Sequence, residues 1–319
     1  MNLEILENLD VVIQYNVPLA EFTTFHLGGP CKGLIQCQTP LQLETVVTYF
    51  INNNFPFLLI GGGSNLVISD QGVNCYVIRY LSNTPIIKRD GNDLIVSGST
   101  ILDDLAQYAI ECGLEGLTYT SGIPGTVGGA VVGNAGAFGK QVGDVTKSVT
   151  LLTKEGIKKH VGPEELNFQY RDSDLKKTGD ILLSVCFGLT PGDKIQMQNE
   201  RHELLRIRHE KHPNLKTHPC AGSFFRNIEP TSKAGKRQAA GWFLEQAGGS
   251  KLKYGGAVIF EKHANIIVKS DGCCAQDVYE LSKEMMQIVK DQFNLDLVRE
   301  VRFVGSFKGI PTQIKDIVW

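Results

Sequence analysis

Two glycine-rich segments are the parts of this chain best suited to bind a charged ligand. The first places Gly61, Gly62 and Gly63 directly after an apolar run, in "LIGGGSNL", and the second is the segment 121–139, "SGIPGTVGGAVVGNAGAFG". Because glycine lacks a Cβ and accepts positive φ, successive backbone N–H groups in such loops can converge on an anion. The acceptors that suit such loops are phosphate oxygens.

The familiar nucleotide-binding motifs are absent from both segments. Neither contains the Gly-Lys-Ser/Thr end of a P-loop, and no Gly-x-Gly-x-x-Gly opens a helix with an acidic residue about 20 positions later. Tight turns and close packing are the alternative for a triple glycine on its own. The second segment favours a ligand, because Pro124 stiffens the turn, Thr126 adds a hydroxyl group and Asn134 adds an amide that can bond a ring edge or a carbonyl.

Composition gives the chain no general attraction for nucleic acid or for an anionic membrane. The 319 residues include 32 basic and 34 acidic side chains, for a formal charge of −2, and 42% are hydrophobic. An anionic ligand must therefore be held locally, and the length favours two or three folding units. Since no apolar stretch approaches the roughly 20 residues of a membrane span and the N-terminus lacks signal-peptide features, we expect a cytoplasmic protein.

The cysteines and histidines predict neither a disulfide scaffold nor a metal site. Eight cysteines include no Cys-x-x-Cys pair, and Cys273 and Cys274 are simply adjacent. In a chain this long they indicate reduced thiols. The seven histidines are scattered, with no His-x-x-x-His or Cys/His grouping, so no metal is expected.

The elements that must position these residues alternate between helices and strands. Helical spacing of apolar residues predicts helices over 41–54, 235–247 and 276–293. Two more helices are predicted, one over 101–112 that ends at Gly113 and one over the charged, helix-prone stretch 194–211. Strands are predicted at 55–60, 75–80, 94–97, 145–153 and 180–189, with paired strands over 255–270. This order predicts an α+β protein whose main domain boundary lies near residues 191–215, which begin with a Pro-Gly break.

Eight short motifs also occur in the order found in one family of flavoenzymes. They are "TTFHLGGP" (23–30), "GGGSN" (61–65), "GIPGTVGGA" (122–130), "NAGAFG" (134–139), "YRDS" (170–173), "AGSFFRN" (221–227), "EKHAN" (261–265) and "EVRFVG" (300–305). Through them the chain resembles the UDP-N-acetylenolpyruvoylglucosamine reductases, the MurB family of peptidoglycan synthesis, over nearly its whole length. It resembles the shorter, second subclass, which lacks a long tyrosine-bearing insertion.

The resemblance implies a vanillyl-alcohol-oxidase/PCMH-like FAD-binding fold followed by a C-terminal α+β substrate-binding domain. We expect the FAD-binding region to span 1–200, in two α+β lobes over about 1–75 and 76–200, and the substrate-binding domain to span 201–319. The implied FAD contacts come from the two glycine segments. They are Ile60, Gly61, Gly62, Gly63, Ser64, Asn65, Leu66, Ile123, Pro124, Gly125, Thr126, Gly128, Gly129, Ala130, Gly133, Asn134, Gly136 and Ala137.

The resemblance also implies a reaction. In such enzymes NADPH reduces a tightly held FAD and leaves, and the enolpyruvyl ether of a UDP-sugar takes its place. Flavin N5 delivers hydride to the terminal carbon, negative charge develops on the neighbouring carbon and its carboxylate, and UDP-N-acetylmuramate is formed. The implied proton donor is Ser223, and the implied stabilisers of the carboxylate and enolate are Arg171 and Glu300. The implied substrate contacts are Tyr170, Asn227, Gln246 and Gly256.

The residue types by themselves leave simpler roles open. Ser223 can cap a turn, because serine hydroxyls commonly bond nearby backbone, and no Gly-x-Ser-x-Gly motif marks a hydrolase nucleophile. Glu300 can be a solvated carboxylate that pairs with Arg299 or Arg302. His263 is assigned no role in a site.

Three classes of function remain to be compared. A peptidoglycan reductase would hold FAD noncovalently, whereas an FAD-dependent oxidase of the same wider fold often carries a covalent histidine link. Neither glycine segment contains a histidine for such a link, although His26 lies near the first. A flavin-free binding module is the third class. For this protein we expect a UDP-sugar as its small-molecule partner, with no nucleic acid, no membrane insertion and no obligate protein partner.

Overall fold

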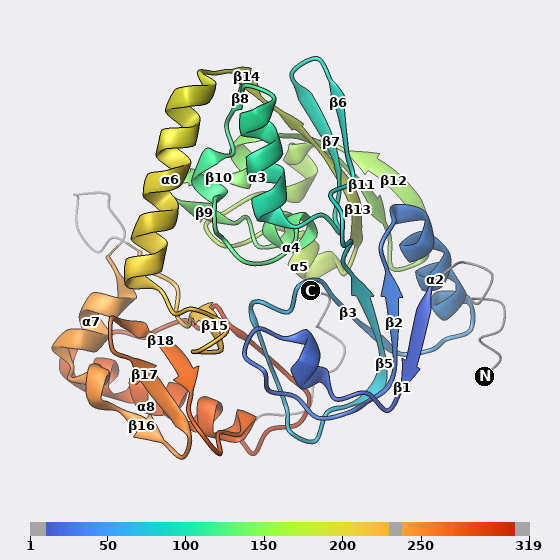
Figure 1. Ribbon diagram of the computed structural model, residues 1–319. Coiled ribbons are helices and arrows are strands. Elements are labelled where there is room, and N and C mark those ends of the chain that lie inside the picture. Colours follow the sequence, from blue (N-terminus) through green and yellow to red (C-terminus); the bar gives the residue numbers. More distant parts are fainter. Residues whose placement is uncertain (1–10, 230–237, 310–319) are drawn as a thin grey trace.

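The computed structural model describes residues 11–229 and 238–309 (Figure 1). Within these residues three larger β-sheets are each accompanied by helices, which confirms the predicted α+β class. Helix α6 (Lys194–Lys211) runs from the strand pair β8 (Leu114–Glu115) and β14 (Thr190–Pro191) toward the C-terminal sheet. No helix in the described ranges is long and apolar enough to span a membrane.

The first sheet leads into the first glycine segment. Its order is β1-β2-β5-β3, with β1 antiparallel to β2 and the other pairs parallel. Helix α2 (Pro40–Asn52) begins at Thr39, which forms a capping box with Gln42. The strands are β1 (Val12–Tyr15), β2 (Cys31–Cys37), β3 (Phe57–Ile60) and β5 (Val73–Tyr80), and the lobe boundary expected at residue 75 falls inside β5.

The second sheet is antiparallel and supports the second glycine segment. Its order is β12-β11-β13-β7-β6, and one apolar core joins it to the first sheet through residues such as Phe50, Tyr80 and Phe187. Its strands are β6 (Ile87–Asp90), β7 (Asp93–Ser97), β11 (Thr146–Leu152), β12 (Lys158–Val161) and β13 (Ile181–Gly188). The helices nearby in sequence are α3 (Leu102–Glu111), α4 (Val127–Val132) and α5 (Leu175–Thr178).

The third sheet has its own core. Its order is β15-β18-β17-β16, and Phe224, Ile266 and Met285 are among its buried residues. The strands are β15 (Cys220–Ser223), β16 (Lys253–Tyr254), β17 (Ala257–Phe260) and β18 (His263–Lys269). The helices are α7 (Ala240–Gln246) and α8 (Ala275–Phe293), the second of which begins with a capping box of Cys274 and Asp277.

Most elements predicted from periodicity are confirmed. The helices predicted over 41–54, 101–112, 194–211 and 276–293 correspond to α2, α3, α6 and α8, and the predicted paired strands are β17 and β18. The helix predicted over 235–247 begins at Ala240, and residues 235–237 lie outside the described residues. The main domain boundary expected near 191–215 falls on α6 and stays a prediction.

Two long-range pairings connect the third sheet to the first glycine segment. Phe225 forms an antiparallel bridge with Arg299, and the N–H of Glu300 donates to the carbonyl of Phe224 at 2.9 Å. Immediately afterwards β19 (Arg302–Val304) pairs in parallel with β4 (Leu66–Ile68). Residues around 223 and 300 are therefore brought to the end of the first glycine loop.

Asn265 stabilises this connection. The residue is 3% exposed, and its side-chain amide accepts the N–H of Phe225 at 2.9 Å and donates to the carbonyl of Phe225 at 2.8 Å. We expect Asn265→Ala to lower the free energy of unfolding by about 2 kcal/mol or more, because both backbone groups lose their buried partner. Chemical unfolding measures this. Asn53→Ala removes an exposed bond to the carbonyl of Tyr49 and should change stability little; equal losses in the two variants would contradict the assignment.

Candidate active site

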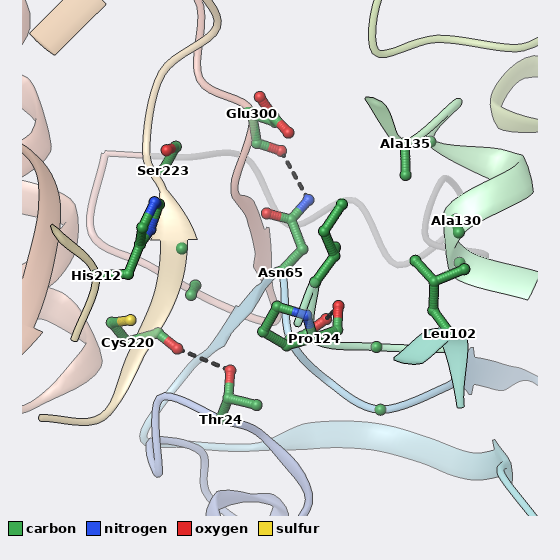
Figure 2. Close-up of a pocket in the computed structure, with 18 of the residues that line it drawn as sticks. Thr24, Asn65, Leu102, Pro124, Ala130, Ala135, His212, Cys220, Ser223 and Glu300 are labelled. Atoms are coloured by element: carbon green, nitrogen blue, oxygen red, sulfur yellow. Dashed lines mark hydrogen bonds between the residues drawn. The ribbon is translucent and has the colours of Figure 1, made fainter. Parts of the chain in front are cut away.

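A cavity of about 760 Å³ is lined by both glycine segments, the end of α6, β15 and the segment before β19 (Figure 2). This volume lies within the range of small-molecule sites. Figure 2 shows Asn65 and Pro124 from the two loops and Ser223 and Glu300 from the C-terminal part around the same space. Widely separated stretches of sequence therefore share one pocket.

The glycines of the first loop are required for close packing. Gly63 has φ of +64°, and a Cβ on it would collide with the carbonyl oxygen of Phe22. A Cβ on Gly62 would lie 3.3 Å from Cα of Gly125 in the second loop. Close packing, the alternative to ligand binding, therefore explains part of the need for glycine here, because the two loops lie directly against each other.

The same loop offers backbone donors to a ligand. In the described part of the chain, the N–H groups of Gly62, Gly63 and Ser64 have no hydrogen-bond acceptor. The hydroxyl of Ser64 donates to the carbonyl of Pro124 at 3.1 Å and ties the two loops together. Because backbone donors away from bulk water are normally paired, these three groups fit an anionic ligand.

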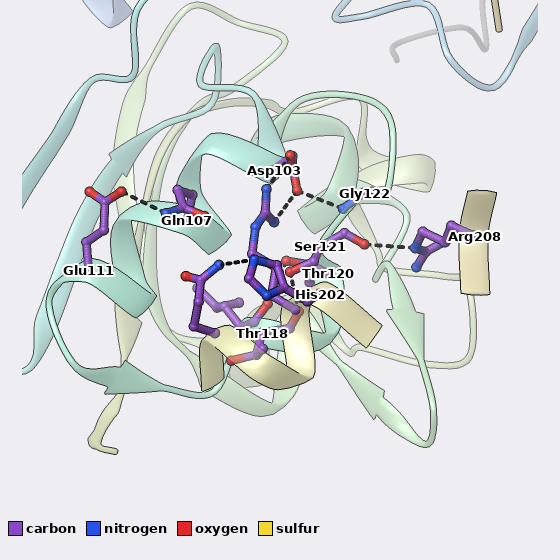
Figure 3. A network of polar contacts seen from close by, with 12 residues as sticks. Asp103, Gln107, Glu111, Thr118, Thr120, Ser121, Gly122, His202 and Arg208 are labelled. Carbon is purple, nitrogen blue, oxygen red and sulfur yellow. Dashed lines mark hydrogen bonds and ion pairs between the residues drawn. The ribbon is translucent and has the colours of Figure 1, made fainter. Parts of the chain in front are cut away.

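A polar network holds the second loop against helices α3 and α6 (Figure 3). The carboxylate of Asp103 accepts the N–H of Gly122 at 2.7 Å and two bonds from Arg201 at 2.6 and 2.9 Å. Burial alone would raise the pKa of Asp103, but the hydrogen bonds from Arg201 and Gly122 hold it below its usual value. Arg208 Nε donates to the carbonyl of Ser121 at 2.8 Å. The loop is therefore fixed at two adjacent backbone groups.

The three residues expected to be catalytic all line the cavity. Ser223 ends β15, and its hydroxyl has no hydrogen-bond partner among the described residues, so it does not cap a turn there. The carbonyl of Glu300 accepts from Asn65 Nδ2 at 3.1 Å, shown dashed in Figure 2. The carboxylate of Glu300 pairs with Arg171, whereas Arg299 donates to Ser282.

The contact between Arg171 and Glu300 is an ion pair without good hydrogen-bond alignment. Arg171 Nε lies 3.1 Å from Glu300 Oε1, yet this N–H has no acceptor in suitable geometry. The two side chains are 26% and 24% exposed. Arg171 also has φ of +56°, a left-handed conformation that costs a non-glycine residue about 1–2 kcal/mol. Its surroundings must hold that conformation in place.

The cavity is strongly cationic although the chain carries a net charge of −2. Arg171, Lys176, Arg208 and Arg302 line it together with the carboxylate of Glu300. Burial, followed by the nearby charge of Arg226, lowers the pKa of Lys176 to about 8. Such a site favours anionic groups.

Lys176 and Arg208 were not identified from the sequence. Lys176 stands in an irregular stretch, and Arg208 belongs to a charged segment that predicted only a helix. The nearest signal was the proximity of Lys176 to the "YRDS" motif.

A histidine pair lies at the cavity wall. Burial, then the neighbouring His263 and the charges of Arg208 and Lys211, lower the pKa of His212 to about 4. The two imidazole rings are 5.6 Å apart, and only His212 of the pair lines the cavity. His212 is therefore a neutral hydrogen-bonding group at pH 7. In residues 11–229 and 238–309, no cluster of three or more His, Cys, Asp and Glu could hold a metal, and all eight cysteines are free thiols.

Most residues expected to contact FAD line the cavity. Three of them do not, because they are buried or form hydrogen bonds within the protein. Ile60 is fully buried, and the N–H of Gly128 donates to the carbonyl of Gly98 at 2.8 Å. The side-chain amide of Asn134 donates to the carbonyl of Gln169 at 2.7 Å and is therefore not available to bond the ring edge of a ligand. Those that do line it are Gly61, Gly62, Gly63, Ser64, Asn65, Leu66, Ile123, Pro124, Gly125, Thr126, Gly129, Ala130, Gly133, Gly136 and Ala137.

The four expected substrate contacts lie outside the cavity lining. The N–H of Asn227 donates to the hydroxyl of Tyr170 at 3.3 Å, which joins two distant parts of the chain. Gln246 is exposed at the end of α7. Gly256 is buried, and a Cβ there would collide with the backbone of Cys273, so packing explains its type. Contact of these four residues with a substrate stays a prediction.

The fold and cavity can now be compared with known proteins. The family model "FAD binding domain" matches residues 31–162, so the chain is a flavoprotein of the FAD-binding, PCMH-like class. The model "UDP-N-acetylenolpyruvoylglucosamine reductase, C-terminal domain" matches residues 212–304. The chain belongs to the MurB family of UDP-N-acetylenolpyruvoylglucosamine reductases.

Individual relatives align along almost the whole chain. The reductase of Lactobacillus johnsonii is 36% identical over 312 residues, covering 97% of this chain and all of its own. That of Enterococcus faecalis is 34% identical and covers 94% and 97%. The crystal structure of the Thermus caldophilus enzyme has a TM-score of 0.75 at 31% identity, covering 92% and 98%. The predicted family and fold are confirmed, and the subclass stays a prediction.

The residues at the cavity fit FAD. The N–H groups of Gly62, Gly63 and Ser64, which have no acceptor within residues 11–229 and 238–309, suit a diphosphate, and the loop from Ile123 to Ala130 forms the adjoining wall. These groups come from the segment matched by the FAD-binding model.

Gly63 provides a test of this fit. We expect Gly63→Ala to weaken FAD binding by about 10-fold or more, because the added Cβ collides with Phe22 and displaces the donors, each charge-assisted bond contributing over 1 kcal/mol. Flavin titration of the apoprotein measures the affinity. Gly91→Ala is the matched control: Gly91 has a similar φ of +60° with nothing within 4 Å. Unchanged affinity in Gly63→Ala would separate the loop from the flavin.

Proposed function

We propose that this chain is an FAD-dependent enzyme that consumes NADPH and reduces the enolpyruvyl group of UDP-N-acetylglucosamine enolpyruvate to give UDP-N-acetylmuramate in peptidoglycan synthesis. The observation that carries the proposal is the convergence of Ser223, Arg171 and Glu300 on the cavity lined by both glycine segments. Membership of the MurB family and the FAD-binding domain support the same reaction. The cationic lining suits a substrate that has a diphosphate and a carboxylate.

Ser223 is the proposed proton donor. When bound, FAD supplies the hydride for the terminal carbon of the enolpyruvyl group. The hydroxyl of Ser223 holds a proton for the neighbouring carbon, where negative charge develops, and no described residue competes as its acceptor. A serine hydroxyl is a weak acid, so its contribution depends on position and on the high basicity of the acceptor carbon.

Arg171 and Glu300 are proposed to act on the substrate carboxylate. A guanidinium aimed where charge develops can stabilise the transition state by about 3 kcal/mol. Because the bond from Arg171 Nε to Glu300 is poorly aligned, the guanidinium keeps donors for a ligand while the carboxylate restricts its position. The backbone carbonyl of Glu300 accepts a hydrogen bond from Asn65 of the first glycine loop, which fixes this residue's main chain.

The proposed reaction places the protein in the cytoplasm. NADPH is supplied there, and the eight cysteines, all free thiols, remain reduced in that compartment.

Absorbance and kinetics of the purified protein test the proposal. We expect a visible flavin spectrum and NADPH consumption that depends on the enolpyruvyl UDP-sugar. Reduced flavin that reacts rapidly with oxygen and ignores the UDP-sugar would instead support an oxidase. A folded but colourless protein that takes up no FAD would support a flavin-free binding module.

Ser223→Ala should separate the two half-reactions. We expect flavin reduction by NADPH to be unchanged, while oxidation of reduced flavin by the UDP-sugar slows about 100-fold or more, because the general acid is lost. Stopped-flow absorbance measures both steps. Ser250→Ala, at an exposed serine, should leave both unchanged. Equal slowing of the two steps in Ser223→Ala would indicate a role in binding or folding instead.

Arg171→Lys is expected to be a damaging substitution. An ammonium group is a point charge and cannot reproduce the bidentate geometry of a guanidinium on a carboxylate. We expect the oxidative half-reaction to slow about 10- to 100-fold, corresponding to part of the electrostatic stabilisation. Arg206→Lys is the control, because Arg206 pairs with Glu203 at an exposed position on α6. Wild-type turnover in Arg171→Lys would remove Arg171 from the mechanism.

A further inference from the structure

Lys176 makes an unusual contact with the backbone of Arg171. Its Nζ donates to the carbonyl oxygen of Arg171 at 2.5 Å and lies 3.7 Å from Oδ1 of Asp172. Lys176 belongs to helix α5, its side chain is only 22% exposed, and it lines the cavity. A half-buried ammonium group is thus directed at the main chain of a proposed active-site residue.

The contacted backbone has a conformation that needs support. Gln169 and Asp172 exchange two backbone hydrogen bonds, at 3.0 and 3.1 Å, so Tyr170 and Arg171 form the corner of a tight turn. Arg171 is the third residue of that turn and has φ of +56°. This position normally selects glycine or asparagine, because a Cβ is unfavourable at positive φ. Contacts from outside the turn must therefore hold arginine there.

The contact with Lys176 supplies that support. The orientation of the peptide after Arg171 is set by where its carbonyl points, and the ammonium group fixes that direction with a charge-assisted hydrogen bond. The backbone orientation in turn sets the direction of the Arg171 side chain, whose Nε lies 3.1 Å from Glu300. Lys176 is thereby linked to the position of the guanidinium.

We propose that Lys176 is a positioning residue for the proposed reduction: its protonated amine holds Arg171 in the left-handed turn and keeps the guanidinium beside Glu300 at the cavity. This inference rests on the proposed role of Arg171. Lys176 itself need not touch the substrate.

The charges around Lys176 make its role sensitive to pH. Asp172 from the turn and Glu300 from the segment before β19 favour the ammonium form, whereas Arg226 after β15 and Arg302 of β19 oppose it. Burial is the largest influence, and the pKa of Lys176 falls to about 8. The cationic form is therefore present below that pH and is lost as pH rises through it.

Rapid kinetics of three variants test the proposal. We expect Lys176→Met to slow the oxidative half-reaction about 10- to 100-fold, the range for misplacing a reacting group, while flavin binding and reduction by NADPH stay unchanged. Lys176→Arg retains the charge and should restore most of the rate. Lys177→Met is the matched control, because Lys177 is 63% exposed and pairs with Asp174. Wild-type rates in Lys176→Met, or equal slowing of both half-reactions, would overturn the proposal.

The pH profile gives a readout that a purely structural role would not change. The wild-type oxidative half-reaction should slow as pH rises through about 8, as Lys176 loses its proton. Lys176→Arg should move this decline to higher pH, because arginine stays charged. If Lys176→Met fails to fold, this comparison decides: a decline at the same pH in the Arg variant overturns the proposal.

A crystal structure of Lys176→Met separates this inference from the proposed function. We expect Arg171 to leave positive φ and its guanidinium to move away from Glu300. An unchanged Arg171 would overturn the positioning role. A wild-type protein that does not reduce the UDP-sugar would overturn the proposed function, while the conformation of Arg171 in the variant would still decide what Lys176 does.

Discussion

The cavity depends on the return of the C-terminal segment to the first glycine loop. Parallel pairing of β19 with β4 and the bridge between Phe225 and Arg299 place Glu300 and Ser223 next to residues that follow β3. Backbone hydrogen bonds fix both strands in register, so the side chains have little freedom to move apart. The loop that offers N–H donors and the segment before β19 that offers the carboxylate of Glu300 are thus held together by backbone pairing.

Charge is concentrated where this connection closes. A chain with nearly balanced acidic and basic residues gathers four cationic side chains around the carboxylate of Glu300. Burial and, after it, neighbouring like charges such as that of Arg226 disfavour a cation here, and together they lower the pKa of Lys176 to about 8. An anionic ligand would relieve that repulsion, so the arrangement favours ligands with diphosphate or carboxylate groups.

The glycine segments combine a structural and a binding role. Gly62 and Gly63 are needed for the two loops to lie against each other and against the carbonyl of Phe22, whatever ligand is present. This packing leaves the N–H groups of Gly62, Gly63 and Ser64 without acceptors in the described residues. The packing and ligand interpretations of the triple glycine are therefore complementary.

The sequence by itself determined the longer helices α2, α3, α6 and α8, several strands and the loops that line the cavity, because helical and strand periodicity and glycine conformation are local properties. Its ordered motifs indicated the family, whereas the short helices α4 and α5 had no such periodic pattern and were not predicted. Only the tertiary structure decided which of the expected residues share the cavity. In the folded chain the amide of Asn134 bonds the protein itself and Gln246 lies outside the cavity lining. Lys176 and Arg208, which the sequence did not single out, line the cavity. Such contacts join residues far apart in the chain, and no local pattern records them.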